Sequence, residues 1–501
     1  MSYHLPGNID CNKIFLINRS AILERLDPSV YKPMFFYSSK KYKVFKLSTL
    51  AWIDPITDFS KLNPDTEISF VPMESIDAGN GIINNYRKIK VGESKGYTRF
   101  QENDLLWAKI TPCMQNGKSA IARNLLKGVG CGSTEYFVIR PKSEDVLVEY
   151  LHFLLRNKKI LLSAMNYFGG SAGQQRVSSI FLENFQVPLP PIEVQQQICD
   201  QITQTYITKQ EKEAKAKYLL SSIDSYLLKE LGIILPSQKK IEDVSDKLNS
   251  LMNSGRLFFV DYRDITGKRI DPKIYNKDTV LLKQAISNSK YDCVELGMFI
   301  THYCSGDWGK DENDVLVGES GNYTRCLVIR ATEFDNNDNL RLDNDRAKYR
   351  LINTDKLEQL NIKENDILFE KSGGSKDQPV GRVAILTKDI INSYTNKLAF
   401  SNFIAKIRLN EGVLPEYIFN FLKVMHNIKM TDVMQSQTNG IRNLIIDEFF
   451  NQLIPVPSIE KQHEIVENIK LIRETIKQLN REAYQILEST EQQIEKIIFG
   501  E

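Results

Sequence analysis

Apolar residues recur in alternating steps of four and three near the end of the chain. These residues are Ile465, Ile469, Ile472, Ile476, Leu479, Ala483 and Ile486. Such spacing is typical of a helix that pairs with another helix along a narrow seam. No proline or glycine interrupts the chain from Ile459 to Phe499, and Gly500 follows as a stop signal. The pattern therefore predicts one helix of about 40 residues.

A similar stretch lies 267 residues earlier in the chain. Residues 192–231 contain no proline or glycine, and Gly232 follows them. Shifted by 267 residues, the seam falls on four apolar residues near the two ends of this stretch: Ile198, Ile202, Leu219 and Ile223. In the middle of this stretch, the seam positions are occupied by Lys209 and Lys212, which could face a partner protein rather than the other helix.

Each long helix could pack only on the core of its own domain, or the two could pair with each other. A helix of roughly 40 residues would be about 60 Å long, at 1.5 Å per residue, and would overshoot an ordinary domain. We therefore predict that the two helices pair in antiparallel fashion and form a spacer between two globular parts.

The repeat extends well beyond the helices. "PLPPIEVQQQI" from Pro188 matches "PVPSIEKQHEI" from Pro455, and "ENDLLWAKI" from Glu102 matches "ENDILFEKS" from Glu364. "RLDPSVY" and "RIDPKIY" form a third pair, in the same order along the chain. "VGESKGYTR" and "VGESGNYTR" also look alike, but they stand at different distances from the "END" segments, so we interpret that match as coincidence. The chain thus contains two related units.

Between these landmarks, strand-like and helix-like segments are mixed. "YFVIRP", "GRVAIL" and "FSNFIAKIRL" predict strands, whereas the segments from Val148 and from Pro415 have helical spacing. We predict an α+β fold with two tandem mixed α/β domains, separated by a pair of long antiparallel coiled-coil helices. The predicted borders are 1–190 for the first domain, 191–235 for the first helix, 236–255 for a linker, 256–456 for the second domain and 457–501 for the second helix.

Composition limits the possible functions. The 501 residues carry a formal net charge of only +2, and the seven cysteines form no C-x-x-C pair. The chain starts without a signal-peptide pattern and has no apolar run near the 18 residues of a membrane span, so we expect a cytoplasmic protein without a membrane partner. It has no phosphate-binding G-x-x-x-x-G-K-[ST] motif and no D/N-P-P-Y/F/W methyltransferase motif. We expect no catalytic residues, no metal and no cofactor in this chain.

The doubled P-x-P-x-I-E-x-Q pattern, the paired "END" segments and the two long helices resemble the specificity subunit of Type I restriction–modification systems. The resemblance covers nearly the whole chain. It implies that each globular part is a target-recognition domain that reads one half of a split, asymmetric site in double-stranded DNA. It also implies that the helices dock two modification subunits, which bring methyltransferase activity and S-adenosylmethionine, and that restriction (motor) subunits complete the assembly. This chain itself would not be an enzyme.

The candidate DNA contacts lie in loops that the two units share. Lys109 and Lys371 occupy equivalent strand-to-loop positions. The loops after them offer polar side chains that can bond to base edges: Gln115, Asn116, Lys118, Lys376, Gln378 and Arg382. Arg176 and Arg442 come from a second pair of loops, and Arg99 lies in the stretch 86–127, where nine basic and three acidic residues leave a local excess of +6. We interpret Trp107 and Phe369 as core residues.

Two alternatives stay open. In a related assembly, the modification partner would also cleave DNA, and this chain would look the same. In the other alternative, the chain is a protein-interaction adaptor that does not bind nucleic acid. A steep dependence of DNA binding on salt would distinguish a DNA-binding subunit from the adaptor.

Overall fold

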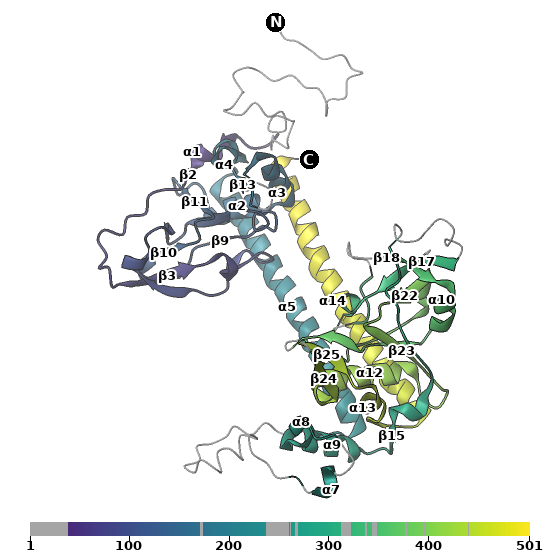
Figure 1. Cartoon of the computed structure of the whole chain (residues 1–501). Coiled ribbons are helices and arrows are strands. Elements are labelled where there is room, and N and C mark those ends of the chain that lie inside the picture. Colours follow the sequence, from purple (N-terminus) through teal and green to yellow (C-terminus); the bar gives the residue numbers. More distant parts are fainter. Residues whose placement is uncertain are drawn as a thin grey trace, which may run out of the picture. The chain divides into compact units, whose positions relative to one another are not determined.

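The chain forms two compact units in the computed structural model (Figure 1). The structure describes residues 39–170, 174–236, 260, 262–265, 269–311, 322–335, 338–342, 348–375, 378–394, 397–438 and 440–500. Unit 1 comprises Met1–Glu213 and Arg481–Glu501, and unit 2 comprises Ala214–Asn480. Each unit therefore contains part of both long helices. The domain borders drawn from the sequence remain predictions.

Unit 1 contains two four-stranded sheets, in the orders β2-β11-β8-β9 and β6-β3-β10-β7. Their strands are β2 (Ala51–Ile53), β3 (Glu67–Val71), β6 (Arg87–Lys90), β7 (Thr98–Gln101), β8 (Leu105–Ala108), β9 (Ser119–Ile121), β10 (Val129–Gly132) and β11 (Tyr136–Pro141). Three short strand pairs flank them: β1 (Val44–Lys46) with β14 (Gln186–Pro188), β4 (Ile76–Asp77) with β5 (Ile82–Ile83), and β12 (Phe168–Gly169) with β13 (Arg176–Val177). The shorter helices of this unit are α1 (Leu47–Leu50), α2 (Val148–Arg156), α3 (Lys158–Ala164) and α4 (Ser179–Asn184).

Unit 2 repeats the first sheet as β16-β23-β19-β21, and its second sheet, β18-β17-β22, has three described strands where that of unit 1 has four. Their strands are β16 (Ile300–Ser305), β17 (Tyr323–Ile329), β18 (Lys348–Asn353), β19 (Ile367–Glu370), β21 (Val383–Ile385), β22 (Lys397–Phe400) and β23 (Ile404–Leu409). The other strands are β15 (Cys293–Glu295), β20 (Ser372–Gly374), β24 (Gln435–Thr438), β25 (Ile441–Leu444) and β26 (Leu453–Pro455). The helices are α7 (Tyr262–Ile265), α8 (Pro272–Tyr275), α9 (Lys277–Ser287), α10 (Thr354–Leu360), α11 (Lys388–Asn392), α12 (Pro415–Asn427) and α13 (Ile446–Phe450).

The structure tests several of the predicted elements. The predicted strands correspond to β11, β21 and β23. The helix predicted from Val148 is broken at Asn157, whose side chain accepts a hydrogen bond from the amide of Lys159 and so caps a second helix, α3. The "GYTR" and "NYTR" segments lie in different strands: β7 pairs antiparallel with β10, whereas β17 pairs parallel with β22. Their likeness is therefore not part of the repeat. The "RLDPSVY" segment lies outside the described residues.

The "END" segments are tight turns held by a buried carboxylate. Asn103 and Asn365 both adopt the left-handed backbone conformation, at φ 66° and 67°, which asparagine tolerates well. The next residue, Asp104, accepts hydrogen bonds from the Gln101 amide and from the Arg140 guanidinium on β11. Each END turn thus begins a central strand and ties it to the strand beside it.

The END turn of unit 2 has the same arrangement, but its buried carboxylate bonds to two cationic side chains instead of one. Asp366 accepts from the Lys363 amide, from Arg408 and from the fully buried ammonium of Lys406, at 2.9 Å. Burial lowers the pKa of Lys406, while its hydrogen bond to Asp366 raises it.

The proline-rich segment joins each sheet to the start of a long helix. Gln195 is fully buried, and its amide group donates to the carbonyls of Pro190 and Asp145, while its oxygen accepts from the Leu147 amide. In unit 2, Gln462 makes the matching bonds to Pro457 and Leu414. The glutamine of the repeated pattern therefore satisfies backbone groups that would otherwise be buried without partners.

The two long helices are α5 (Ile192–Leu231) and α14 (Ile459–Phe499), as the sequence predicts. Gly232 and Gly500 follow them with positive φ, which stops each helix. In unit 1, Gln201 of α5 bonds to Gln493 of α14, and Thr205 of α5 bonds to Thr490 of α14. Residue numbers therefore rise along α5 in the direction in which they fall along α14. In unit 2, Tyr226 likewise bonds to Asn468. The helices are therefore antiparallel in both units.

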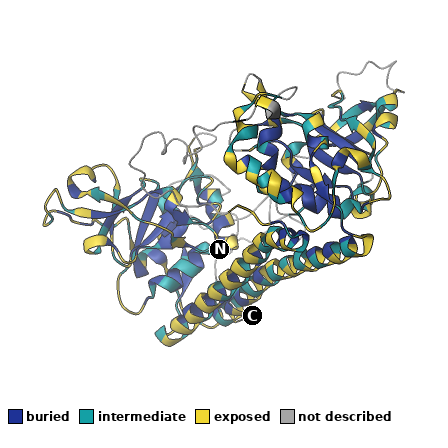
Figure 2. Ribbon diagram, turned by 90° about the horizontal axis from the view of Figure 1, so that it is seen from below, coloured by how far each residue is buried: buried dark blue, intermediate teal, exposed yellow. Residues whose placement is uncertain are grey.

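The predicted seam is largely buried. Ile198, Ile202, Ile223, Ile465 and Ile469 are buried, whereas Leu219, Ile472, Ile476 and Leu479 are half-buried. Exposed residues cover the remaining faces of the helices (Figure 2).

The suggestion that Lys209 and Lys212 face a partner protein needs correction. Lys212 pairs with Glu482 of α14 at 2.6 Å, and Lys209 is buried and pairs with Glu213 on its own helix. The middle of the seam is thus a polar layer rather than a gap in the pairing.

Candidate nucleic-acid interface

In unit 1 the structure brings the two predicted loops side by side. Lys109 directly follows β8, and its carbonyl accepts a hydrogen bond from the amide of Val177 in β13. Ile110 forms an isolated bridge with Arg176, and the Thr111 amide donates to Gln175. The loop after β8 and the β12–β13 hairpin therefore form one continuous surface segment.

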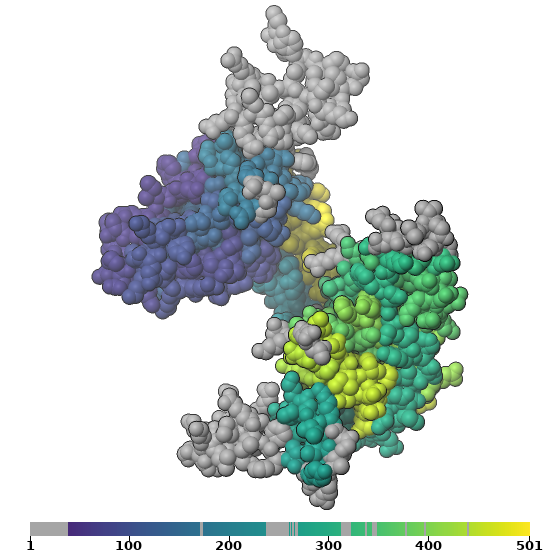
Figure 3. Space-filling view, viewed as in Figure 1, coloured from purple at the N-terminus to yellow at the C-terminus, as the bar shows by residue number. Residues whose placement is uncertain are grey.

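Unit 2 uses the same backbone arrangement. The Leu444 amide of β25 donates to the carbonyl of Lys371, and Ser372 pairs with Asn443. Lys371 thus corresponds to Lys109, as predicted. Figure 3 shows residues of the β24–β25 region at the surface of this unit.

The second predicted pair of residues is shifted by one position. Because Val177 corresponds to Leu444, the residue that corresponds to Arg176 is Asn443 rather than Arg442. Neighbouring residues of a strand point to opposite faces, so Arg176 and Arg442 do not present their side chains in equivalent ways. Arg442 is half-buried and pairs in the sheet with Gly374 and Gln437.

The side chain of Arg176 lies at the surface of unit 1 and is held by one carboxylate. Its Nε and Nη2 groups donate to Glu135, with a shortest distance of 2.7 Å, and Nη1 donates to the Gln174 carbonyl at 3.2 Å. The hydrogen bond to Glu135 raises the pKa of Arg176. Nearby, Lys109 places its ammonium 5.1 Å from the ring centre of Phe137.

In unit 2, Lys371 donates to the hydroxyl of Ser305 at 2.9 Å, and burial lowers the pKa of its ammonium. Gln378 is exposed, and its backbone bonds with Ser375 close the loop. Lys376 lies outside the described residues.

Two of the predicted DNA contacts make bonds within the fold. Arg382 is only 8 % exposed, and its guanidinium makes two hydrogen bonds, at 2.9 and 3.0 Å, to the equally buried Glu370. It cannot reach a base edge without breaking that pair, so the structure does not support its predicted role. Lys118 donates to the Met73 carbonyl at 2.9 Å and is half-buried, which ties its loop to the segment after β3.

The basic excess of residues 86–127 is smaller than it looks in the sequence. Four of its cations pair with carboxylates from outside that stretch: Arg87 with Glu74, Lys88 with Glu67, Lys90 with Asp65 and Arg123 with Glu149. Arg99 is half-buried, donates to Ser94 and lies 4.6 Å from the ring centre of Phe59. Exposed ion pairs are weak, so DNA phosphates can compete for the cations of the four pairs.

Of the remaining candidates in unit 1, Gln115 and Asn116 are exposed at the tip of the loop after β8. Trp107 and Phe369, by contrast, are buried against aromatic neighbours and belong to the cores.

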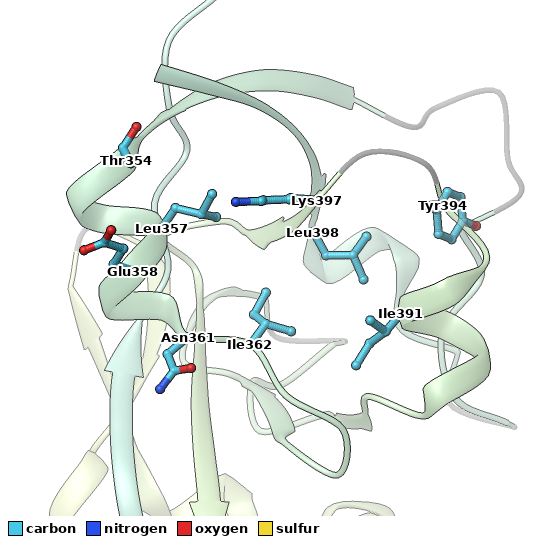
Figure 4. Close-up of a pocket in the computed structure, with 9 residues that line it drawn as sticks. All are labelled: Thr354, Leu357, Glu358, Asn361, Ile362, Ile391, Tyr394, Lys397 and Leu398. Atoms are coloured by element: carbon cyan, nitrogen blue, oxygen red, sulfur yellow. The ribbon is translucent and has the colours of Figure 1, made fainter. Parts of the chain in front are cut away.

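A pocket of about 570 Å³ lies elsewhere in unit 2, between α10, α11 and β22 (Figure 4). Its lining combines aliphatic residues, such as Leu357 and Ile391, with polar ones, such as Glu358 and Lys397. In the described part of the chain, no group of three or more His, Cys, Asp or Glu residues is placed to hold a metal ion. Nor does any helix within those ranges have both the length and the apolar character needed to cross a membrane.

In each unit, one further residue lies beside the strand-to-loop lysine and was not predicted from the sequence. Glu135 and Phe403 occupy the same place in a turn: "STEY" leads from β10 into β11, and "SNFI" leads from β22 into β23. The Lys109 amide donates to the Glu135 carbonyl, and the Lys371 amide donates to that of Phe403. A shared serine is the only identity in these turns, which is too weak a signal to align them from sequence.

A family model described as the Type I restriction modification DNA specificity domain matches residues 39–218 and 314–489. The chain belongs to this family. The two matched regions cover most of the described residues, and each contains one END turn.

Two curated relatives of this specificity-family chain come from Escherichia coli. The EcoAI specificity subunit is 34 % identical over 207 residues, which is 40 % of this chain and 34 % of the relative. The EcoEI specificity subunit is 30 % identical over 262 residues, or 48 % of this chain and 44 % of the relative. The chain thus spans less than half the length of either curated relative it matches.

A solved chain from work on complex assembly and conformational transition of the type I R-M system matches with a TM-score of 0.51. It is 15 % identical, and the match covers 93 % of this chain and 98 % of that one. At that level of identity the likeness concerns the fold alone.

Proposed function

We propose that this chain is the non-catalytic DNA-specificity subunit of a Type I restriction–modification complex. Each unit reads one half of a bipartite, asymmetric site in double-stranded DNA through the loops around Lys109 and Lys371. The observation that carries the proposal is the duplication: the two units share one four-stranded central sheet and one loop arrangement beside it, yet they present different side chains at equivalent positions.

The same duplication supports an asymmetric site. Arg176 in unit 1 corresponds to Asn443 in unit 2, and Glu135 corresponds to Phe403. Direct readout of base pairs in the major groove depends on such side chains. Two domains with the same backbone arrangement but different surface side chains are suited to reading two different half-site sequences.

The partners follow from the family. We propose that two modification subunits dock on the outer faces of α5 and α14, which carry exposed residues along their length. These partners supply S-adenosylmethionine and the methyl-transfer chemistry, and restriction (motor) subunits join the full complex. The chain holds no cofactor of its own in this proposal and acts in the cytoplasm.

Methyl transfer from labelled S-adenosylmethionine to DNA tests the proposal, using the modification subunit with and without this chain. We expect defined sites to be methylated only when both proteins are present, and we expect the affinity of the complex for DNA to fall steeply with salt. Methylation by this chain alone would contradict the proposal. Unchanged methylation without the chain, or an assembly that does not bind DNA, would favour the adaptor alternative.

A further inference from the structure

The turn that contains Glu135 in unit 1 and Phe403 in unit 2 is a second point at which the halves differ. Both turns enter the central strand of their sheet, and both lie against the strand-to-loop lysine through a backbone hydrogen bond of 2.9 Å. Glu135 and Phe403 therefore stand at the same place beside the candidate DNA loops.

Phe403 is unusual for a phenylalanine in a well-packed unit, because 46 % of its surface is exposed. Its ring lies over Gly373, where a side chain would approach the ring to 3.6 Å. Gly373 has φ +95°, a conformation that favours glycine, so residue 373 places no side chain over the ring. Ser372, which precedes Gly373 in β20, forms a side-chain hydrogen bond with Asn443 of β25.

In unit 1 the same place carries an ion pair instead. Glu135 fixes the guanidinium of Arg176 through its Nε and Nη2 groups, and Nη1 donates to Gln174. These contacts use three of the five N–H donors of a guanidinium. The arginine is thereby oriented while donors remain for a further acceptor.

We propose that this shared turn position determines sequence specificity in both half-sites. Phe403 contacts the methyl group of a thymine in the half-site read by unit 2. Arg176, positioned by Glu135, donates to the N7 and O6 acceptors of a guanine in the half-site read by unit 1. The inference rests on the proposed function, and it deepens that function by assigning a base to each unit.

The chemistry of the grooves supports this assignment. An apolar ring can distinguish thymine by its methyl group, which projects into the major groove, and arginine is the commonest partner of guanine there. Removing a thymine contact should cost about one buried methyl group, or roughly fourfold in affinity. Removing a good arginine–guanine contact should cost about 5- to 150-fold.

The test for unit 2 uses the purified complex of this chain with its modification subunit. It measures binding to synthetic duplexes in which each thymine of the second half-site is replaced, one at a time, by uracil, which lacks the methyl group. We expect one replacement to weaken the wild-type complex about fourfold, and Phe403→Ala to bind the thymine and uracil duplexes equally.

Met298→Ala is the matched control, because Met298 is also exposed but lies beside Ile300, which pairs with Leu409 at the end of β23, whereas Phe403 directly precedes the start of β23. It should keep the thymine preference. A wild-type complex that binds its site but ignores every uracil replacement overturns the assignment of Phe403, even if the variant fails to fold. Equal thymine preference in wild type and Phe403→Ala overturns it as well.

The test for unit 1 replaces each guanine of the first half-site by 7-deazaguanine, which lacks the N7 acceptor. One replacement should weaken the wild-type complex, whereas Arg176→Ala should bind both duplexes alike. Arg87→Ala is the control, since it also removes an exposed, ion-paired arginine of unit 1. Loss of a phosphate contact there would weaken binding to both duplexes alike and leave the guanine preference intact. A half-site without a sensitive guanine overturns the role of Arg176. A wild-type complex without any sequence preference would instead refute the proposed function.

Discussion

The hydroxyl of Tyr150 donates a 2.6 Å hydrogen bond to the buried carbonyl oxygen of Pro188. Tyr417 does the same for Pro455, at the same distance and 267 residues further on. Both tyrosines lie on the helix that covers the sheet, and both prolines end the strand that leads into a long helix. This bond joins the helix that covers each central sheet to the strand that leads into a long helix.

Removing either hydroxyl should weaken that connection. Tyr150→Phe or Tyr417→Phe leaves a buried carbonyl without this donor, so we expect each to lower the free energy of unfolding by about 1–3 kcal/mol. Urea unfolding measures the loss. Tyr484→Phe and Tyr218→Phe, at exposed positions of the long helices, should change stability little. Equal effects of the buried and exposed substitutions would speak against this role.

Arg382→Ala should act on stability rather than on DNA sequence. Burial raises the pKa of Glu370, and the Arg382 guanidinium opposes that shift. Without its partner the buried carboxylate stays uncompensated, which should cost about 3–5 kcal/mol of unfolding free energy. Arg442→Ala, on the neighbouring hairpin, is the comparison and should cost far less. An Arg382→Ala protein with normal stability and a changed methylated sequence would restore the role predicted from sequence.

Lys423 should make the stability of unit 2 depend on pH. Its ammonium donates to the carbonyls of Asp335 and Asp338. Burial, together with the charge of Arg473 on α14, lowers its pKa to about 7, although the carboxylates of Asp338, Asp335 and Asp224 oppose that shift. In the unfolded chain the pKa of a lysine is near 10.4. Between these values the unfolded chain binds a proton that the folded chain does not, so this group adds stability as pH rises.

The comparison is between the wild type and Lys423→Met, with the free energy of unfolding measured at pH 7 and pH 9. The wild type should gain stability relative to the variant over this interval. A constant difference between the two proteins would mean that Lys423 keeps an ordinary pKa in the folded chain.

The sequence predicted the repeated elements because their signals are local. Uninterrupted helical spacing ended by Gly232 and Gly500 is enough to place both long helices. The END turns and the P-x-P-x-I-E-x-Q segments could be aligned because their buried Asp and Gln side chains bond to nearby backbone, which constrains residue type. Fold class and family follow from such patterns.

The interface was harder to predict because burial and ion pairing depend on distant segments. In the sequence, Arg382 is an arginine in a polar loop. Its ion pair with Glu370 forms only because β19 pairs with β21. Lys212 interrupts the apolar seam in the sequence. In the structure it pairs with Glu482 of the other long helix. Phe403 was missed because the turn before β23 has little sequence in common with the turn before β11.

The central claim, that each unit reads its own half of the site, is tested most directly by sequencing the methylated sites of a host. The host would carry the modification subunit with either the wild-type chain or Lys371→Ala. For the wild type we expect two different half-sites separated by an unread gap. For Lys371→Ala we expect either relaxed sequence at the half-site of unit 2 or uniformly weaker methylation if the lysine contacts phosphate, with the other half-site unchanged in both cases. A palindrome of identical half-sites in the wild type, or a change of sequence in both half-sites of the variant, would contradict the account.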